Sequence, residues 1–308
     1  MNRWWIRPSV RVLAALLLPL VVPAVITGFI WALPGDPASL ICPPHICGGT
    51  EALARRWNLD GGPIQFFLGW VIDAAQLEFG NSWRLHQGLP VLGLLEQAIP
   101  TTVALISMAT AFVMVGAFFA STGLIPRKVD PTLRVVGLIP GLVLGLLGAA
   151  FIELTYGFAS FSASGQLARL VVGAIVLGIA DGAFGGAVLG TRAAFDTENR
   201  ERYVGIAILR GERTIQNTLP NLAPALIGQM RARIVHLLSG GVIIEVILRI
   251  DGLGSLLWGG TLRQDFGVVL AAATLFAVVS SVLLLVQAVL ETLVALHVRR
   301  APRIGVRA

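Results

Sequence analysis

Gln97–Pro126, QAIPTTVALISMATAFVMVGAFFASTGLIP, runs for 30 residues without one ionisable side chain. About 20 helical residues cross the roughly 30 Å apolar core of a bilayer, so this run is long enough to be a transmembrane helix. The whole chain agrees: of its 308 residues, 56% are hydrophobic and 13% are charged, and the mean hydropathy is +0.81. This composition excludes disordered, collagen-like and small disulfide-rich proteins and predicts an integral membrane protein.

Five further apolar runs extend this to an all-α integral membrane protein with six transmembrane helices. The run at 12–33 could instead be a cleaved signal peptide. It exceeds the usual 7–15 apolar residues, however, and no clear cleavage site comes after it, which favours an uncleaved span. The predicted spans are 12–33, 100–125, 135–157, 167–190, 223–247 and 266–292. The predicted segments outside the bilayer include 1–11, 34–99, 191–222, 248–265 and 293–308.

The basic residues predict the orientation. With the N-terminus inside, 15 of the 23 Lys and Arg residues fall on the cytoplasmic side, 6 fall outside and two lie within the fifth span. The positive-inside rule therefore places both termini in the cytoplasm. The net charge of +6 reflects this topology, and it does not indicate a nucleic-acid-binding surface.

The cytoplasmic connection 191–222 contains a helix-compatible stretch, Asn199–Arg210. Val204 and Ile208 fall on one side of such a helix, and Ala207 widens the apolar stripe. A short amphipathic helix between two spans could lie on the membrane or dock into a soluble partner. Periodicity does not choose between these two interpretations.

Motifs of catalysis and nucleotide binding are absent from the sequence. It contains no GxxxxGK[ST] phosphate loop, no HExxH, no GxSxG and no Cys/His cluster with the number of ligands that a metal needs. We therefore expect a protein that is not an enzyme and carries no cofactor or metal. Any ATP-driven work would come from partner subunits.

Cys42 and Cys47 bracket Pro43–Ile46 in the external loop. A disulfide is the favoured interpretation, because an oxidising compartment permits it. Two free thiols are the first alternative. A metal site with His45 is the second, and it lacks a fourth ligand.

Ionisable residues inside the predicted spans are candidates for a translocation pathway, because charges at membrane depth usually face protein or water. The candidates are Arg231, Arg233, His236 and Glu245 in the fifth span and Asp181 in the fourth. The alternative is that the two arginines extend to the cytoplasmic interface or pair with Asp181. Both interpretations stay open.

Short motifs occur in a specific order along almost the whole chain. They are LPGDPA at 33–38, WNLD at 57–60, FGNS at 79–82, Ile139–Pro140, Thr191–Arg192, Tyr203–Gly211, GG with Glu245 at 240–245, GLG at 252–254 and Val286–Glu291. In this order the chain resembles the membrane permease subunit of dipeptide/oligopeptide/nickel-type ABC importers, the first of the two paired permeases, as a divergent member.

The resemblance implies the fold of a type I ABC importer permease in the bacterial inner membrane, transporting peptides or related small solutes by alternating access. It implies three kinds of partner: a homologous second permease, two cytoplasmic ATPases and an extracytoplasmic solute-binding protein received by the region 34–99. It also implies that the cytoplasmic connection seats in an ATPase. The residues expected to couple there are Tyr203, Val204, Ala207, Gly211, Arg213 and Thr214.

Some positions depart from the family pattern. Ile208-Leu209-Arg210-Gly211 stands where the family commonly has Arg and Ala before Lys-Gly, and Arg231 and Arg233 stand at neutral positions. A second hypothesis is therefore a permease-like scaffold that has lost transport and stabilises a larger membrane complex. A third is an ion-coupled secondary transporter using Asp181 or Glu245, a class that usually shows inverted repeats and broken helices, neither of which is visible in the sequence.

Overall fold

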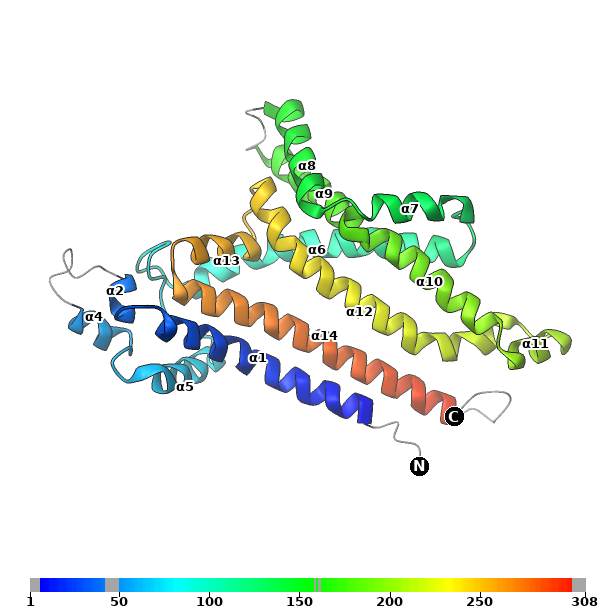
Figure 1. Ribbon diagram of the computed structural model, residues 1–308, viewed down its shortest axis with the longest axis horizontal. Coiled ribbons are helices and arrows are strands. Elements are labelled where there is room, and N and C mark those ends of the chain that lie inside the picture. The colour runs from blue at the N-terminus through cyan, green and yellow to red at the C-terminus, as the bar shows by residue number, and fades with distance from the viewer. Residues whose placement is uncertain (1–5, 42–49, 158, 160–161, 301–308) are drawn as a thin grey trace. The chain divides into compact units, whose positions relative to one another are not determined.

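The computed structural model describes residues 6–41, 50–157, 159 and 162–300 (Figure 1). These residues form helices, and the one strand-like pairing among them is an isolated bridge between Asn81 and Pro90. The expected all-α fold is confirmed. The chain divides into two compact units: unit 1 comprises Met1–Leu13, Ala104–Leu248 and Val282–Ala308, and unit 2 comprises Ala14–Val103 and Arg249–Ser281.

Among the described residues, four helical segments are long and apolar enough to cross a membrane. They are α1 (Ile6–Ala32), α6 (Val91–Ser121), α9 (Ala163–Ile179) together with α10 (Ala183–Asn199), and α14 (Phe266–Arg300). A bent pair would make a fifth span: η1 (Arg127–Val129) with α7 (Asp130–Val136) meets α8 (Gly141–Tyr156) at 88°. The interpretation as a membrane protein is confirmed.

The expected fifth span lies within α12 (Thr214–Leu248), which is not among those apolar segments. Its 35 residues are ample in length, but Arg231, Arg233 and Glu245 lower its hydropathy. The helix also runs through Pro220 and Pro224. The count of six spans and the cytoplasmic position of both termini remain predictions.

In unit 1 the helix of the fourth span is broken, which the sequence did not reveal. Between α9 and α10 lies η3 (Ala180–Gly182), where Asp181 has φ +50° and Gly182 has φ +72°. Glycine adopts such angles without strain, whereas Asp181 is one of the few residue types that tolerate them. This break gives the expected 167–190 helix two separate halves.

The break in the fourth span meets the bend between α7 and α8. The Asp181 N–H donates to the Ile139 carbonyl (3.4 Å), and the Gly141 N–H donates to the Asp181 carboxylate (3.1 Å). The backbones touch as well, since a Cβ added to Gly137 would lie 2.9 Å from the Gly182 Cα. Two interrupted helices therefore cross at their interruptions. Beyond this crossing, α12 packs against α8, α9 and α10.

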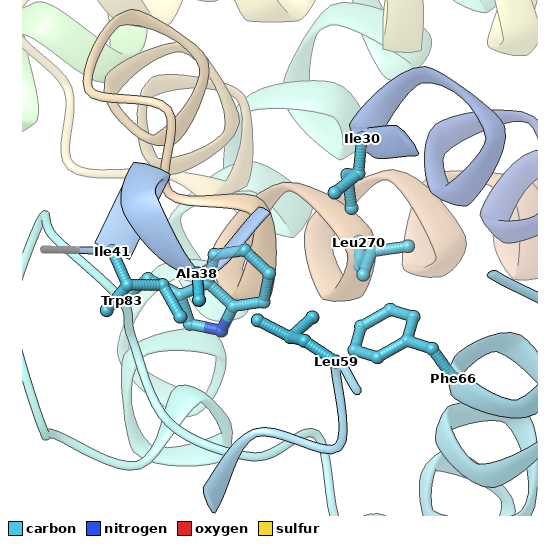
Figure 2. Packing of buried hydrophobic residues seen from close by; sticks show 7 residues of the cluster. All are labelled: Ile30, Ala38, Ile41, Leu59, Phe66, Trp83 and Leu270. Carbon is cyan, nitrogen blue, oxygen red and sulfur yellow. The ribbon is translucent and has the colours of Figure 1, made fainter. Parts of the chain in front are cut away.

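Unit 2 contains the short helices α2 (Pro37–Ile41), α4 (Glu51–Arg56), α5 (Gly62–Ala75) and α13 (Leu253–Leu262). Figure 2 shows seven side chains from α1, α2, α5, α14 and the connecting segments that converge on one apolar cluster. Trp83, 2% exposed, is central to it, and its ring lies 5.9 Å from that of Trp57 and 6.0 Å from that of Phe266. These aromatic side chains supply a core to a segment of otherwise short helices.

A buried carboxylate, Asp265, holds unit 2 together at the start of α14. It accepts hydrogen bonds from the Ser82 hydroxyl and from the backbone N–H groups of Trp83 (2.9 Å), Arg84 (3.0 Å) and Leu85 (2.8 Å). It also caps α14 by accepting from the Val268 N–H (3.2 Å). Burial alone would raise the pKa of Asp265, but the hydrogen bonds from Ser82 and from the backbone outweigh it and hold this pKa below its usual value.

Candidate functional site

The helix expected within 199–210 is α11 (Arg202–Leu209), which packs against α10 and α12 in unit 1. Val204 is 0% exposed and Ala207 is also buried, so this side of α11 is covered by its own chain. Ile206 and Leu209 share the opposite side, three residues apart, and Leu209 is 88% exposed. An apolar surface thus remains uncovered in the connection 191–222 of the described structure.

Tyr203 ties α11 to both neighbouring helices. Its hydroxyl donates to a carboxylate oxygen of Glu198 on α10 and accepts from the Asn221 side-chain amide on α12 at 2.8 Å. Burial, and then the hydrogen bond to Glu198, raise the pKa of Tyr203 to about 12. The hydroxyl is therefore protonated, and remains a donor, throughout the physiological range.

The end of α11 is a tight turn. Gly211 has φ +71°, a conformation that favours glycine just after a helix, and its N–H donates to the Ile208 carbonyl (3.0 Å). The next N–H, of Glu212, returns to the Ala207 carbonyl (3.0 Å). Arg213 is exposed beyond this turn, and the half-buried Thr214 is the first residue of α12. This turn sets the direction in which the chain leaves α11 and begins α12.

Of the five candidate pathway residues, Arg233 has the clearest surroundings. It lines a mostly apolar cavity of about 370 Å³ between α6, α10 and α12. Its guanidinium lies over Gly186 of α10, where an added Cβ would be 2.3 Å from Nη2. One turn earlier, the side-chain amide of Gln229 donates to the Gly190 carbonyl (3.4 Å). Two glycines on α10 thus admit two polar side chains of α12 to the cavity.

The other ionisable residues of α12 lie apart from this cavity lining. Arg231 is partly buried, and its Nε has no hydrogen-bond partner among the residues that the structure describes. His236 is partly buried, and Glu245 is 0% exposed. Of the charged and histidine candidates, the described cavity therefore includes Arg233 alone.

Asp181 does not join the arginines. Its carboxylate accepts from the N–H of Gly141, the first residue of α8, where a negative charge favours the helix N-terminus. Within the described ranges no ion pair links Asp181 to Arg231 or Arg233. The suggested pairing is therefore not formed in this structure. Cys42 and Cys47 lie outside the described residues.

Sequence reasoning missed two features of unit 2. Asp265 stands directly before a long apolar helix, which is the position of a capping residue, and this signal was available. The second feature is a cavity of about 360 Å³ lined by aromatic and acidic side chains from 57–83 and from the start of α14. No short motif predicts it, because its walls come from segments almost 200 residues apart.

Comparison with known proteins identifies a family that matches this chain and relatives that resemble it. Residues 97–296 match the family described as "Binding-protein-dependent transport system inner membrane component". The glutathione transport system permease protein GsiC of Escherichia coli (strain K12) is 25% identical over 269 residues, 83% of this chain and 87% of that protein. The protein of the same name from Salmonella typhi is 25% identical over 279 residues, 87% of this chain and 90% of that protein.

Proposed function

The chain belongs to the family of binding-protein-dependent transport system inner membrane components, and on this basis we propose how it couples to its partners. It is a multi-pass permease subunit of an ABC importer in the inner membrane, as the resemblance to peptide-type permeases implied. Members of this family work with ATPase and binding-protein partners. The particular partners, the substrate and the coupling residues of this chain are the subject of the proposal.

We propose that α11 docks into a cytoplasmic ATPase through the apolar residues Ile206, Ile208 and Leu209. The observation that carries this proposal is the exposure of these three residues on a helix whose Val204 and Ala207 are buried against its own chain. Covering exposed apolar groups with a partner is favourable by about 25 cal/mol for each Å² removed from water. Val204, Ala207 and Tyr203 would then orient the helix, and Gly211 would set the turn behind it.

The assembly would contain a homologous second permease, two ATPases and an extracytoplasmic binding protein. This chain would not hydrolyse ATP itself, because its sequence has no phosphate loop. ATP-driven movement of α11 would change the access of the pathway, and Arg233 would offer a charge-assisted hydrogen bond to a carboxylate of the substrate. Peptides are the proposed substrate class, in keeping with the relatives named for glutathione transport.

The test replaces the exposed apolar pair on α11. The double variant Ile206→Ser/Leu209→Ser should leave the unfolding temperature unchanged, because both side chains are exposed. Binding-protein-stimulated ATP hydrolysis in reconstituted complexes should fall about tenfold, which corresponds to about 1.4 kcal/mol of docking free energy. Leu124→Ser is the matched control, since Leu124 is an exposed leucine outside α11.

Two results would contradict this proposal. Full ATPase stimulation in the double variant would exclude α11 as the docking element. If the wild-type complex, gently solubilised from its membrane, contains no ATPase at all, the chain is instead a scaffold that keeps the permease fold without transport.

A further inference from the structure

The cavity of about 360 Å³ in unit 2 has no role in the proposed coupling. Two aromatic pairs form part of its wall. The rings of Trp57 and Trp83 lie 5.9 Å apart, and those of Trp70 and Phe79 lie 6.3 Å apart. Tryptophan faces attract cations placed within about 6 Å of the ring. Trp83 is buried in the apolar cluster of unit 2, whereas Trp57 and Trp70 are partly exposed, so these two rings are the ones suited to a positively charged group that also has an apolar surface.

Two carboxylates, Asp73 and Glu78, stand at the same cavity. The backbone holds them together at the end of α5, because the Glu78 N–H donates to the Asp73 carbonyl (2.9 Å) and Leu77 adopts φ +66° between them. This is the helix-ending arrangement in which the chain turns back on the last helical turn. Their proximity is built into the fold.

Asp73 and Glu78 give the cavity negative charge. The described residues that line it include no Arg, Lys or His, and no ion pair of Asp73 or Glu78 occurs in the part of the chain that the structure describes. Asp73 also lies in the last turn of α5, where the helix dipole disfavours a negative charge. Both carboxylates are exposed in the described structure, so they are accessible to a cation.

The chemistry of the lining selects an organic cation over a metal ion. Within the described ranges no group of three or more His, Cys, Asp or Glu side chains is placed to hold a metal. Two exposed carboxylates and two partly exposed indole rings instead match an ammonium group, which takes a charge from one side and an aromatic face from the other. We propose that this cavity binds an organic ammonium group, supplied by a free solute or by a lysine of the binding protein.

The first experiment measures choline binding to the full-length permease complex in lipid nanodiscs by isothermal titration. The neutral isostere 3,3-dimethyl-1-butanol and equimolar sodium chloride are the ligand controls. We expect saturable binding of choline and none of the isostere. In Asp73→Asn/Glu78→Gln the affinity should fall at least tenfold, whereas Asp60→Asn, another exposed acid of unit 2, should bind as the wild type does.

Equal titrations for choline and its isostere, or an unchanged affinity in the double variant, would overturn the proposal. Both substituted side chains are exposed, so the variants should fold, and their unfolding temperatures check this. ATP hydrolysis by the same samples reports separately on the coupling through α11. A failure of one proposal therefore leaves the other intact.

A second measurement distinguishes the two sources of the ammonium group. The binding protein is titrated onto the complex with and without saturating choline. Mutual exclusion would assign the group to a lysine of the binding protein, and simultaneous binding would assign it to a free solute. Either result supports an ammonium site, because both require choline to occupy the cavity.

Discussion

Asp265 in unit 2 and Arg231 in unit 1 are charged residues that are buried or partly buried. They differ in how many of their polar atoms have hydrogen-bond partners. Asp265 is fully buried and accepts hydrogen bonds from one hydroxyl and four backbone N–H groups. Arg231 keeps a buried Nε without a partner among the described residues. The first charge organises its own chain, whereas the second keeps one nitrogen that the described residues leave without a partner.

This contrast separates buried charges that serve structure from those that serve another role. A charge whose hydrogen bonds are all made stabilises the fold, and removing it leaves several donors unsatisfied. A charge that is only partly satisfied costs stability, so its presence in a transporter points to another molecule or another conformation that completes it. Substitutions at the two positions should therefore have effects of very different size.

Asp265→Ala should destabilise the protein by about 3–5 kcal/mol, because the Ser82 hydroxyl and three consecutive backbone N–H groups lose their acceptor. Thermal unfolding followed by tryptophan fluorescence measures this, since Trp57 and Trp83 belong to the same unit. Asp251→Ala, at an exposed carboxylate of unit 2, is the control and should change stability by less than about 0.5 kcal/mol. A similar loss in both variants would show that the hydrogen bonds of Asp265 give it no special structural role.

Acid should remove part of the same stabilisation. The pKa of Asp265 is lowered in the fold, so its contribution is complete above the ordinary value of about 3.9 and is lost as the pH falls through the lowered value. The difference in unfolding temperature between the wild type and Asp265→Asn should therefore shrink on acidification. The loss should be smaller than that in Asp265→Ala, because a protonated carboxyl still accepts hydrogen bonds. A difference that is constant with pH would contradict this account.

Arg231→Met should change the free energy of unfolding by less than about 1 kcal/mol, because the methionine removes an unsatisfied Nε and keeps the apolar stem. Uptake by the reconstituted importer should nevertheless fall severalfold if the arginine acts in transport. Arg200→Met, at an exposed arginine after α10, should alter neither quantity. A loss of more than about 2 kcal/mol in Arg231→Met would make Arg231 a structural residue like Asp265.

The sequence predicted the features that depend on local pattern. Charge-free runs such as 97–126 predicted long helices, and the amphipathic stretch 199–210 predicted α11. Periodicity, however, groups residues by side without saying which side is covered. The sequence grouped Ile208 with Val204, yet Val204 is buried and Ile208 is exposed, because α10 and α12 cover only part of α11.

Other features depend on contacts between distant segments, and local pattern could not reveal them. Asp181 reads as one charge in an apolar run, but its helix breaks there in contact with the bend that contains Ile139 and Gly141. The ammonium cavity likewise joins α5 and 78–83 to the start of α14. For the pathway, sequence reasoning identified five ionisable residues, whereas the described cavity in unit 1 includes only Arg233 of these.

The contact between Gly137 and Gly182 limits which residues can replace either glycine during evolution. A methyl group on Gly137 would meet the Gly182 backbone at 2.9 Å, and Gly182 has a positive φ that side chains disfavour. Backbone atoms cannot move aside as a flexible side chain can, so a change at either position requires the crossing itself to be rebuilt. Among homologues that keep the two interrupted helices, we expect glycine at both positions. The flanking apolar positions should vary among apolar residues.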